Sequence, residues 1–258
     1  MAKAIKKVEQ KAMTQYQAGI NDGFEDADAN SFAIPRLKIL QKMSPEVDKD
    51  ASEYVDKASA GDFFNTATGL IYDGKAGITV IPVHFRRSFI EWVTRDEGGG
   101  FVAEHDVTIG EALMKATRRD EMNRDIMPNG HELRDTRTHF LLLVNEDGSF
   151  DMAILSVTRT LITESKNWMN KMRSRRLSDG TPAAMFAQVF KLVTAKKENE
   201  HGSWSVFKAA PVGLITDQFP DNHGEVWAQA VQFREMIKSG AAKVEHTQDN
   251  LVQANEAY

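Results

Sequence analysis

Basic and aromatic residues are interleaved in one stretch of an otherwise acidic chain. Between residues 159 and 176, Arg and Lys side chains surround a tryptophan, and Glu164 is the single acidic residue. Cations in such a pattern can follow a phosphate backbone while the aromatic ring stacks on a base. The alternative is a solvated helix face, because runs of charge are usually exposed surface. The candidate DNA contacts of this stretch form the helix set: Lys166, Trp168, Lys171, Arg173, Arg175 and Arg176.

A second mixture of cations and aromatics occupies residues 84–95, most of which are strand-like. Alternation along a strand places Phe85, Arg87 and Phe89 on one side and Arg86 and Trp92 on the other, so both faces are mixed. Phe85 and Phe89 are predicted to be core. The remaining candidates form the strand set: Arg86, Arg87, Trp92 and Arg95.

A third mixture spans two predicted strands, 184–194 and 204–212, and the polar turn between them, and it includes Lys191 and Phe207. Taken singly, each mixture fits ordinary structure better than a binding site. Three of them, on strands and an adjoining helix of an acidic protein, favour one groove for nucleic acid. The candidates of this stretch form the hairpin set: Lys196, Lys197, Trp204 and Lys208.

Motifs for nucleotide or metal chemistry are largely missing from the sequence. There is no G-x-x-x-x-G-K-[ST] loop, no G-x-G-x-x-G fingerprint and no H-E-x-x-H, so an ATPase, a nicotinamide enzyme or a dedicated zinc site is not expected. Glu104, His105 and Asp106, with Glu91, could supply ligands for a hard metal such as Mg²⁺, which leaves a metal-dependent nuclease as an alternative. The sequence otherwise predicts no catalytic residue, no metal site and no cofactor.

Composition indicates a globular protein with a sizeable core. The chain has 258 residues, 41% of them hydrophobic, and a net charge of −5 from 32 basic and 37 acidic residues. It has no cysteine, which excludes disulfides and thiol chemistry, and no apolar run of about 18 residues that would span a membrane. No secretory signal is visible at the N-terminus, so a cytoplasmic location is expected.

The chain divides into an arm and linker (1–30), one domain (31–238) and a mobile tail (239–258). Within the domain, short strands and turn-rich segments favour a β-rich (α+β) fold, a barrel or a sandwich. Helices are predicted around Leu161–Met172, over about 224–238 and from about Ile109 to Met122. The predicted strands cover 34–40, a hairpin at 63–72, 77–93, a hairpin at 136–158, and the two strands of the third mixture.

Four stretches of the sequence resemble a family of tailed-phage single-stranded DNA-binding proteins. They are Ile34-Pro35-Arg36-Leu37-Lys38-Ile39-Leu40-Gln41, residues 63–69, residues 78–92, and Leu155-Ser156-Val157-Thr158 through Trp168-Met169-Asn170. The resemblance spans about residues 31–215. It implies an OB-like five-stranded barrel with helical insertions. It also implies a role in coating and protecting exposed strands and in helping recombination.

The expected function is therefore non-enzymatic, largely sequence-neutral binding of single-stranded DNA in phage replication or recombination. Partners from the replication or recombination machinery, and a homo-oligomer, remain open. A metal-dependent nuclease or other DNA-processing enzyme is the first alternative. A virion or assembly protein, whose charged segments only join subunits, is the second.

Overall fold

The computed structural model describes residues 34–200, 202–240, 242 and 244. The predicted arm and linker (1–30) lie outside the described residues, as does most of the predicted C-terminal tail. The predicted domain of residues 31–238 is thus described from residue 34 onward, apart from residue 201.

Two long antiparallel strands form the spine of the molecule. β4 (Ile78–Val93) and β8 (Glu132–Val144) pair from Val80 opposite Leu143 to Trp92 opposite Glu132. The predicted strand at 77–93 is confirmed, and the register shift between Pro82 and His84 confirms the predicted bulge. β4 as a whole is flanked on both sides, but at Pro82 only β8 is paired, because the pairing on the other side of β4 ends at Val80 and begins again at Phe89.

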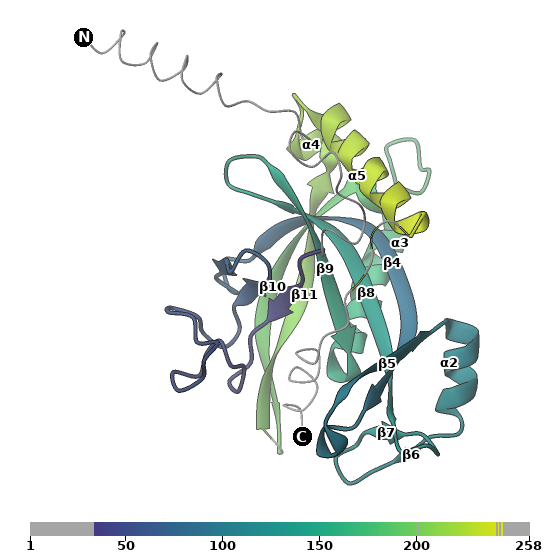
Figure 1. Cartoon of the computed structure of the whole chain (residues 1–258). Helices are drawn as coiled ribbons and strands as arrows, with labels where there is room; N and C mark the ends of the chain where they lie inside the picture. The colour runs from purple at the N-terminus through teal and green to yellow at the C-terminus, as the bar shows by residue number, and fades with distance from the viewer. Residues whose placement is uncertain (1–33, 201, 241, 243, 245–258) are drawn as a thin grey trace, which may run out of the picture.

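β4 and β8 belong to one eight-stranded antiparallel sheet, and they pair with different neighbours at their two ends. At one end lie β9 (Phe150–Thr158), β10 (Gln188–Asn199) and β11 (Gly202–Leu214), and at the other β5 (Gly100–His105), β6 (Arg118–Arg119) and β7 (Asp125–Ile126). The order is β11-β10-β4-β8-β7-β6, with β5 on β4 and β9 on β8. Figure 1 shows β5, β6, β7 and α2 (Val107–Met114) grouped into a small lobe. η1 (Arg95–Glu97) joins β4 to β5.

A second, three-stranded sheet lies beside the first. It comprises β1 (Leu37–Ile39) and the predicted hairpin, which is confirmed as β2 (Phe63–Asn65) and β3 (Ile71–Tyr72). Alternation of apolar and basic residues over 34–40 predicts a half-buried strand whose basic face looks outward, but Lys38 is buried and contacts Glu46 at 2.7 Å. Burial of an ammonium group requires such a partner.

The segment around β1 touches both edges of the main sheet. Ile154 of β9 donates its N–H to the Pro35 carbonyl at 2.8 Å. On the other side, the Gln41 side chain bonds both the N–H and the carbonyl of Ser205 on β11. The sheet is thus bridged between β9 and β11 by an isolated parallel bridge, Arg36 to Ile154, and by the Gln41 side chain. Among the described residues no continuous ladder of hydrogen bonds joins these two edges, so the expected five-stranded OB-like barrel is not confirmed. The predicted β-rich class is confirmed.

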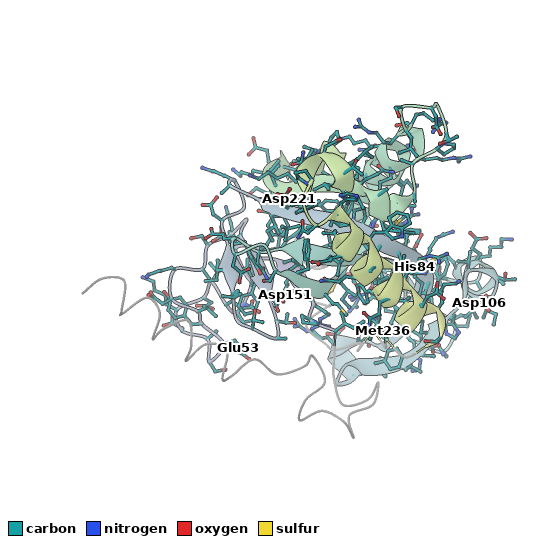
Figure 2. All side chains as sticks on the ribbon, turned by 90° about the horizontal axis from the view of Figure 1, so that it is seen from above. Glu53, His84, Asp106, Asp151, Asp221 and Met236 are labelled. Carbon is teal, nitrogen blue, oxygen red and sulfur yellow. The ribbon has the colours of Figure 1, made fainter. Side chains whose placement is uncertain are left out.

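Apolar side chains cover both faces of the sheet. On β8, Leu141 and Leu143 pack with α3 (Ile162–Ser174) and the small sheet, whereas Phe140 and Leu142 pack with α5 (His223–Lys238). Figure 2 shows α5 crossing the molecule beside His84 and carrying Met236. Three short helices, η2 (Arg159–Leu161), η3 (Met185–Ala187) and α4 (Ile215–Gln218), join these layers.

Both helices with predicted core faces are confirmed. The residues expected to pack are buried in each: Leu161, Ser165, Trp168 and Met172 on or before α3, and Val226, Ala230, Phe233 and Ile237 on α5.

The third predicted helix is shorter than its pattern suggested. It was expected to reach Met122, but α2 ends at Met114, where the Thr117 hydroxyl bonds the Met114 carbonyl. Residues 118–126 instead form β6 and β7, whose turn is closed by Asp120 and Arg124. In this segment the ion pair between Asp120 and Arg124, at 2.7 Å, closes a turn where the pattern predicts helical hydrogen bonds.

Replacing glycine by alanine in two helices should have opposite effects on stability. A Cβ on Gly110 of α2 would lie 2.1 Å from Cδ2 of Phe89, whereas a Cβ on Gly224 of α5 would meet nothing within 4 Å. We expect Gly110→Ala to lower the free energy of unfolding by about 1–3 kcal/mol through overpacking. Gly224→Ala should raise it by up to about 1 kcal/mol through helix propensity. Urea unfolding of both variants tests this, and two changes of the same sign would contradict the packing described for α2.

Candidate nucleic-acid interface

The core contacts of α3 fix the orientation of this basic helix. The Trp168 ring stacks on His139 with a centroid separation of 4.7 Å and meets Phe190 and Phe207 edge-on. His139 also shares a 2.8 Å hydrogen bond with the Ser165 hydroxyl. Because one face is anchored in this way, Lys166, Lys171 and Arg173 project from the exposed part of the helix.

The helix set and the hairpin set come together at the contact between α3 and β11. Buried Glu164 of α3 accepts Lys197 at 2.8 Å and Lys208 at 2.7 Å, and Lys171 donates to the Ala209 carbonyl at 2.7 Å. Burial raises the pKa of Glu164, but the two lysine hydrogen bonds outweigh it and lower the pKa below its usual value. Lys197 and Lys208 therefore neutralise a buried carboxylate, which makes their charge less available to DNA.

A cluster of exposed arginines lies at the end of α3, with Arg173 in its last turn and the others just after it. Arg173, Arg175 and Arg176 are exposed, and Arg176 donates to the carbonyls of the other two. The buried Gln188 side chain holds the base of this loop by donating to the carbonyls of Met172, Ala183 and Ala184. Across the described residues, these three guanidinium groups and Lys166 form no ion pair with a carboxylate.

The strand set does not join this surface. Arg86 pairs with Thr138 and Arg87 with Arg137, so Arg86 lies on the face opposite His139 and α3. Arg87 is held by Asp135 at 2.9 Å and by Glu111 at 2.7 Å, and Arg95 lies in the small lobe. Arg86 instead lies over the Phe140 ring at 5.4 Å.

Burial of two tryptophans argues against the stacking role predicted for them. Trp168 is 1% exposed because it packs against Phe190 and Phe207 in the core. Trp92 is 2% exposed and packs with Ile90 beneath the exposed Phe101 ring, so neither tryptophan offers a face to a base. Trp204 is partly buried. Trp227, which was not a candidate, is 41% exposed and contacts Phe186 of η3 with ring centroids 4.5 Å apart. The only sequence signal for it was its position off the apolar face of α5.

The residues of the metal-nuclease alternative have other roles. Glu91 accepts hydrogen bonds from His105 at 2.8 Å and from His131 at 2.6 Å, while Asp106 caps α2 by accepting from the Ile109 N–H. Glu104 is exposed on β5. In the part of the chain that the structure describes, no three acidic or histidine side chains are placed to hold a metal ion. His131 was missed because it lies far from Glu91 in the sequence.

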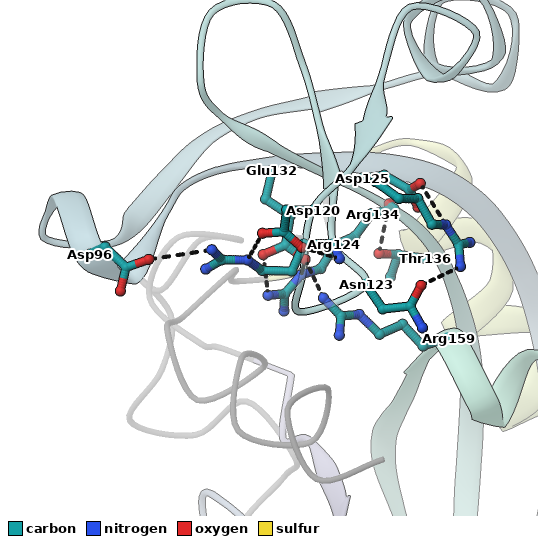
Figure 3. A network of polar contacts seen from close by, with 10 residues as sticks. Asp96, Asp120, Asn123, Arg124, Asp125, Glu132, Arg134, Thr136 and Arg159 are labelled. Atoms are coloured by element: carbon teal, nitrogen blue, oxygen red, sulfur yellow. Dashed lines mark hydrogen bonds and ion pairs between the residues drawn. The ribbon is translucent and has the colours of Figure 1, made fainter. Parts of the chain in front are cut away.

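A cavity of about 650 Å³ beside the small lobe is rich in charge but already neutralised. Figure 3 shows a polar network that includes three of its lining residues: buried Glu132 binds Arg134 at 2.6 Å and Arg159 at 2.7 Å. Burial raises the pKa of Glu132, but the two arginines outweigh it and hold the pKa below its usual value. Arg159 has a φ of +46°, a strained value for a residue with a side chain, so this ion-pair network helps to hold the start of α3 in place.

Acid should loosen the anchor of α3. Burial, with a smaller effect from Arg137, lowers the pKa of His139 to about 3, so His139 is neutral in the folded protein. Between about pH 6.5 and 3 the unfolded chain binds a proton that the folded protein does not, and stability falls by about 1.4 kcal/mol per pH unit as the pH drops through this window. Urea unfolding from pH 6.5 to 5, above the range in which the carboxylates titrate, should show this slope.

His139→Gln should flatten the slope, leaving the part due to His84, whose pKa burial also lowers. The exposed His223 provides the matched control, since His223→Gln should leave the slope as it is. An unchanged slope in His139→Gln would show that this histidine does not govern the acid response.

Comparison with known proteins gives one result. A family model described as Pam3 phage gp34-like protein matches residues 3–243. Comparisons with curated proteins and with solved structures gave no match. Within the structure itself, no helix in the described ranges is long and apolar enough to cross a membrane. Because the family model covers most of the chain, this phage protein belongs to the Pam3 phage gp34-like protein family.

Proposed function

We propose that this protein binds single-stranded DNA without enzymatic activity, in phage DNA replication or recombination. The strand follows a basic surface, which we define as the exposed cations of α3 and the loop after it: Lys166, Lys171, Arg173, Arg175 and Arg176. The observation that carries the proposal is the absence of carboxylate partners for the Arg173, Arg175 and Arg176 guanidinium groups among the described residues.

The contrast with the other cations supports this choice of surface. Arg87, Arg134 and Lys208 are each bonded to a carboxylate, so contact with a phosphate would require breaking an ion pair. Unpaired, exposed guanidinium groups incur no such cost and bind phosphate in a bidentate manner. Phosphate contact of this kind is independent of base sequence, as expected for a protein that coats single strands.

An aromatic platform lies at the far end of the same loop. The loop closes by an Ala183 N–H bond to the Arg175 carbonyl and continues into η3, where Phe186 contacts Trp227 of α5. Arg234 lies over the Phe186 ring at 5.9 Å. Arg234 is itself paired with Glu235 at 2.8 Å, so the platform is offered by the exposed indole, the kind of ring on which bases of a single strand stack. We therefore assign the stacking role to Trp227, in place of Trp92 and Trp168. This position of the stacking residue does not require the eight-stranded sheet to close into a barrel.

Charge reversal on the basic surface should separate binding from folding. We expect the triple variant Arg173→Glu, Arg175→Glu and Arg176→Glu to bind labelled oligo-dT much more weakly at low salt, with the slope of log K against log salt shallower by about 2, at about 0.7 per phosphate contact. Its melting temperature should change little, because exposed charges contribute little to folding. Fluorescence anisotropy across a salt series measures the affinity.

The control carries the same change of net charge at exposed lysines elsewhere: Lys49→Glu, Lys57→Glu and Lys115→Glu. It should lose much less affinity than the first triple variant. Equal losses in the two variants would mean that only overall charge matters. Shortening of the strand on addition of Mg²⁺ would favour the nuclease alternative.

Intrinsic fluorescence should report the exposed indole. We expect oligo-dT to quench the wild-type protein and Trp227→Phe to remove most of the quenching, since a base stacks only on an accessible ring. Trp92→Phe and Trp168→Phe should keep the quenching, because these rings are buried. Quenching that disappears with Trp92 or Trp168 while Trp227→Phe behaves as wild type would disprove the proposed position of the platform.

A further inference from the structure

A second cavity, of about 400 Å³, lies between the small sheet and the β10–β11 hairpin. None of its lining residues belongs to the basic surface. Three lysines, a tryptophan and several hydroxyl groups line it, together with two aspartates. The residues used below are Lys42, Ser59, Asp62, Asp73, Lys75, Lys196, Ser203 and Trp204.

Close backbone packing makes one wall of this cavity rigid. Thr194 of β10 donates its N–H to the Gly74 carbonyl at 2.7 Å and its hydroxyl to the Gly61 carbonyl at 2.6 Å. A Cβ on Gly74 would lie 1.9 Å from the Gly61 oxygen, so no other residue fits there without a shift. The segments that carry the lysines are thus fixed to the hairpin.

The cavity has three lysines against two aspartates, and its aspartates are turned to backbone N–H groups. Asp62 accepts the N–H groups of Gly74 and Ser59, and Asp73 accepts those of Lys75 and Ala76, so both carboxylates are bonded to backbone. Lys42 and Lys75 are exposed and have no ion pair within the described part of the chain. Lys196 contacts the exposed Glu198 at 3.2 Å, an arrangement that contributes little.

Trp204 adds a flat apolar wall to this cationic site. It is partly buried, and its buried indole N–H has no hydrogen-bond partner among the residues that the structure describes. Lysines supply point charges for a phosphate, an indole supplies a stacking face, and the Ser59 and Ser203 hydroxyls can bond a sugar. We propose that this cavity binds a nucleoside phosphate, either as a free nucleotide or as one unit of a DNA strand.

Calorimetric titration with two probes, dAMP and an oligo-dT of about 20 residues, tests the site. The test variant is Lys42→Ala with Lys75→Ala, and the control is Lys49→Ala with Lys57→Ala, two exposed lysines outside the cavity. We expect the test variant to bind at least one probe about tenfold or more weakly, because each lost charge-assisted contact is strong. The control should match the wild type, and thermal melting should show that both variants fold.

The two probes identify the source of the phosphate. Loss of dAMP binding shows a site for free nucleotide, and loss confined to oligo-dT shows that the phosphate belongs to a strand. If neither affinity differs between the test variant and the control, the inference is overturned. The basic-surface variant, with Arg173, Arg175 and Arg176 changed to Glu, should keep dAMP binding, so the failure of one proposal is distinguishable from the failure of the other.

Discussion

Burial of both faces of β8 is the constraint on which the rest of the structure depends. Leu141 and Leu143 point to one side and Phe140 and Leu142 to the other, so each face of the sheet requires its own apolar cover. α3 and the small sheet supply one cover and α5 supplies the other. Because α3 must direct its apolar face at the sheet, its cations are left on the outside, where a polyanion can reach them.

Buried carboxylates decide which of the exposed cations remain available. Glu164 and Glu132 each bind two cations, and Glu91 binds two histidines. Breaking the pair between Arg134 and Glu132, which is buried on both sides, would cost about 3–5 kcal/mol, whereas Lys197 and Lys208 are partly exposed and their pairs with Glu164 contribute less. Counting positive residues along the chain therefore overstates the surface open to DNA. Arg173, Arg175 and Arg176 differ from these cations because, among the described residues, they are not paired with a carboxylate.

Local patterns in the sequence predicted most elements but not the exposure of individual rings. Helical spacing placed Trp168 on the buried face of α3 while its basic neighbours suggested stacking, and the spacing was the better guide. The burial of Trp92 was not predicted, because alternation on a strand does not show which face of the sheet is covered. The contacts of Glu91 with His131 and of Arg87 with Asp135 depend on strand register, which the sequence does not display. The turn between β6 and β7 was missed because charged residues there are also compatible with a helix.

Hydrogen–deuterium exchange with and without oligo-dT tests the central claim most directly, because it locates the DNA on the fold without any substitution. The account predicts slower exchange on binding in the second half of α3, in the loop 175–184 and in η3, with no change in α2 and β5 of the small lobe. Protection confined to the small lobe, or no protection in α3 and its loop under conditions where DNA is bound, would contradict it.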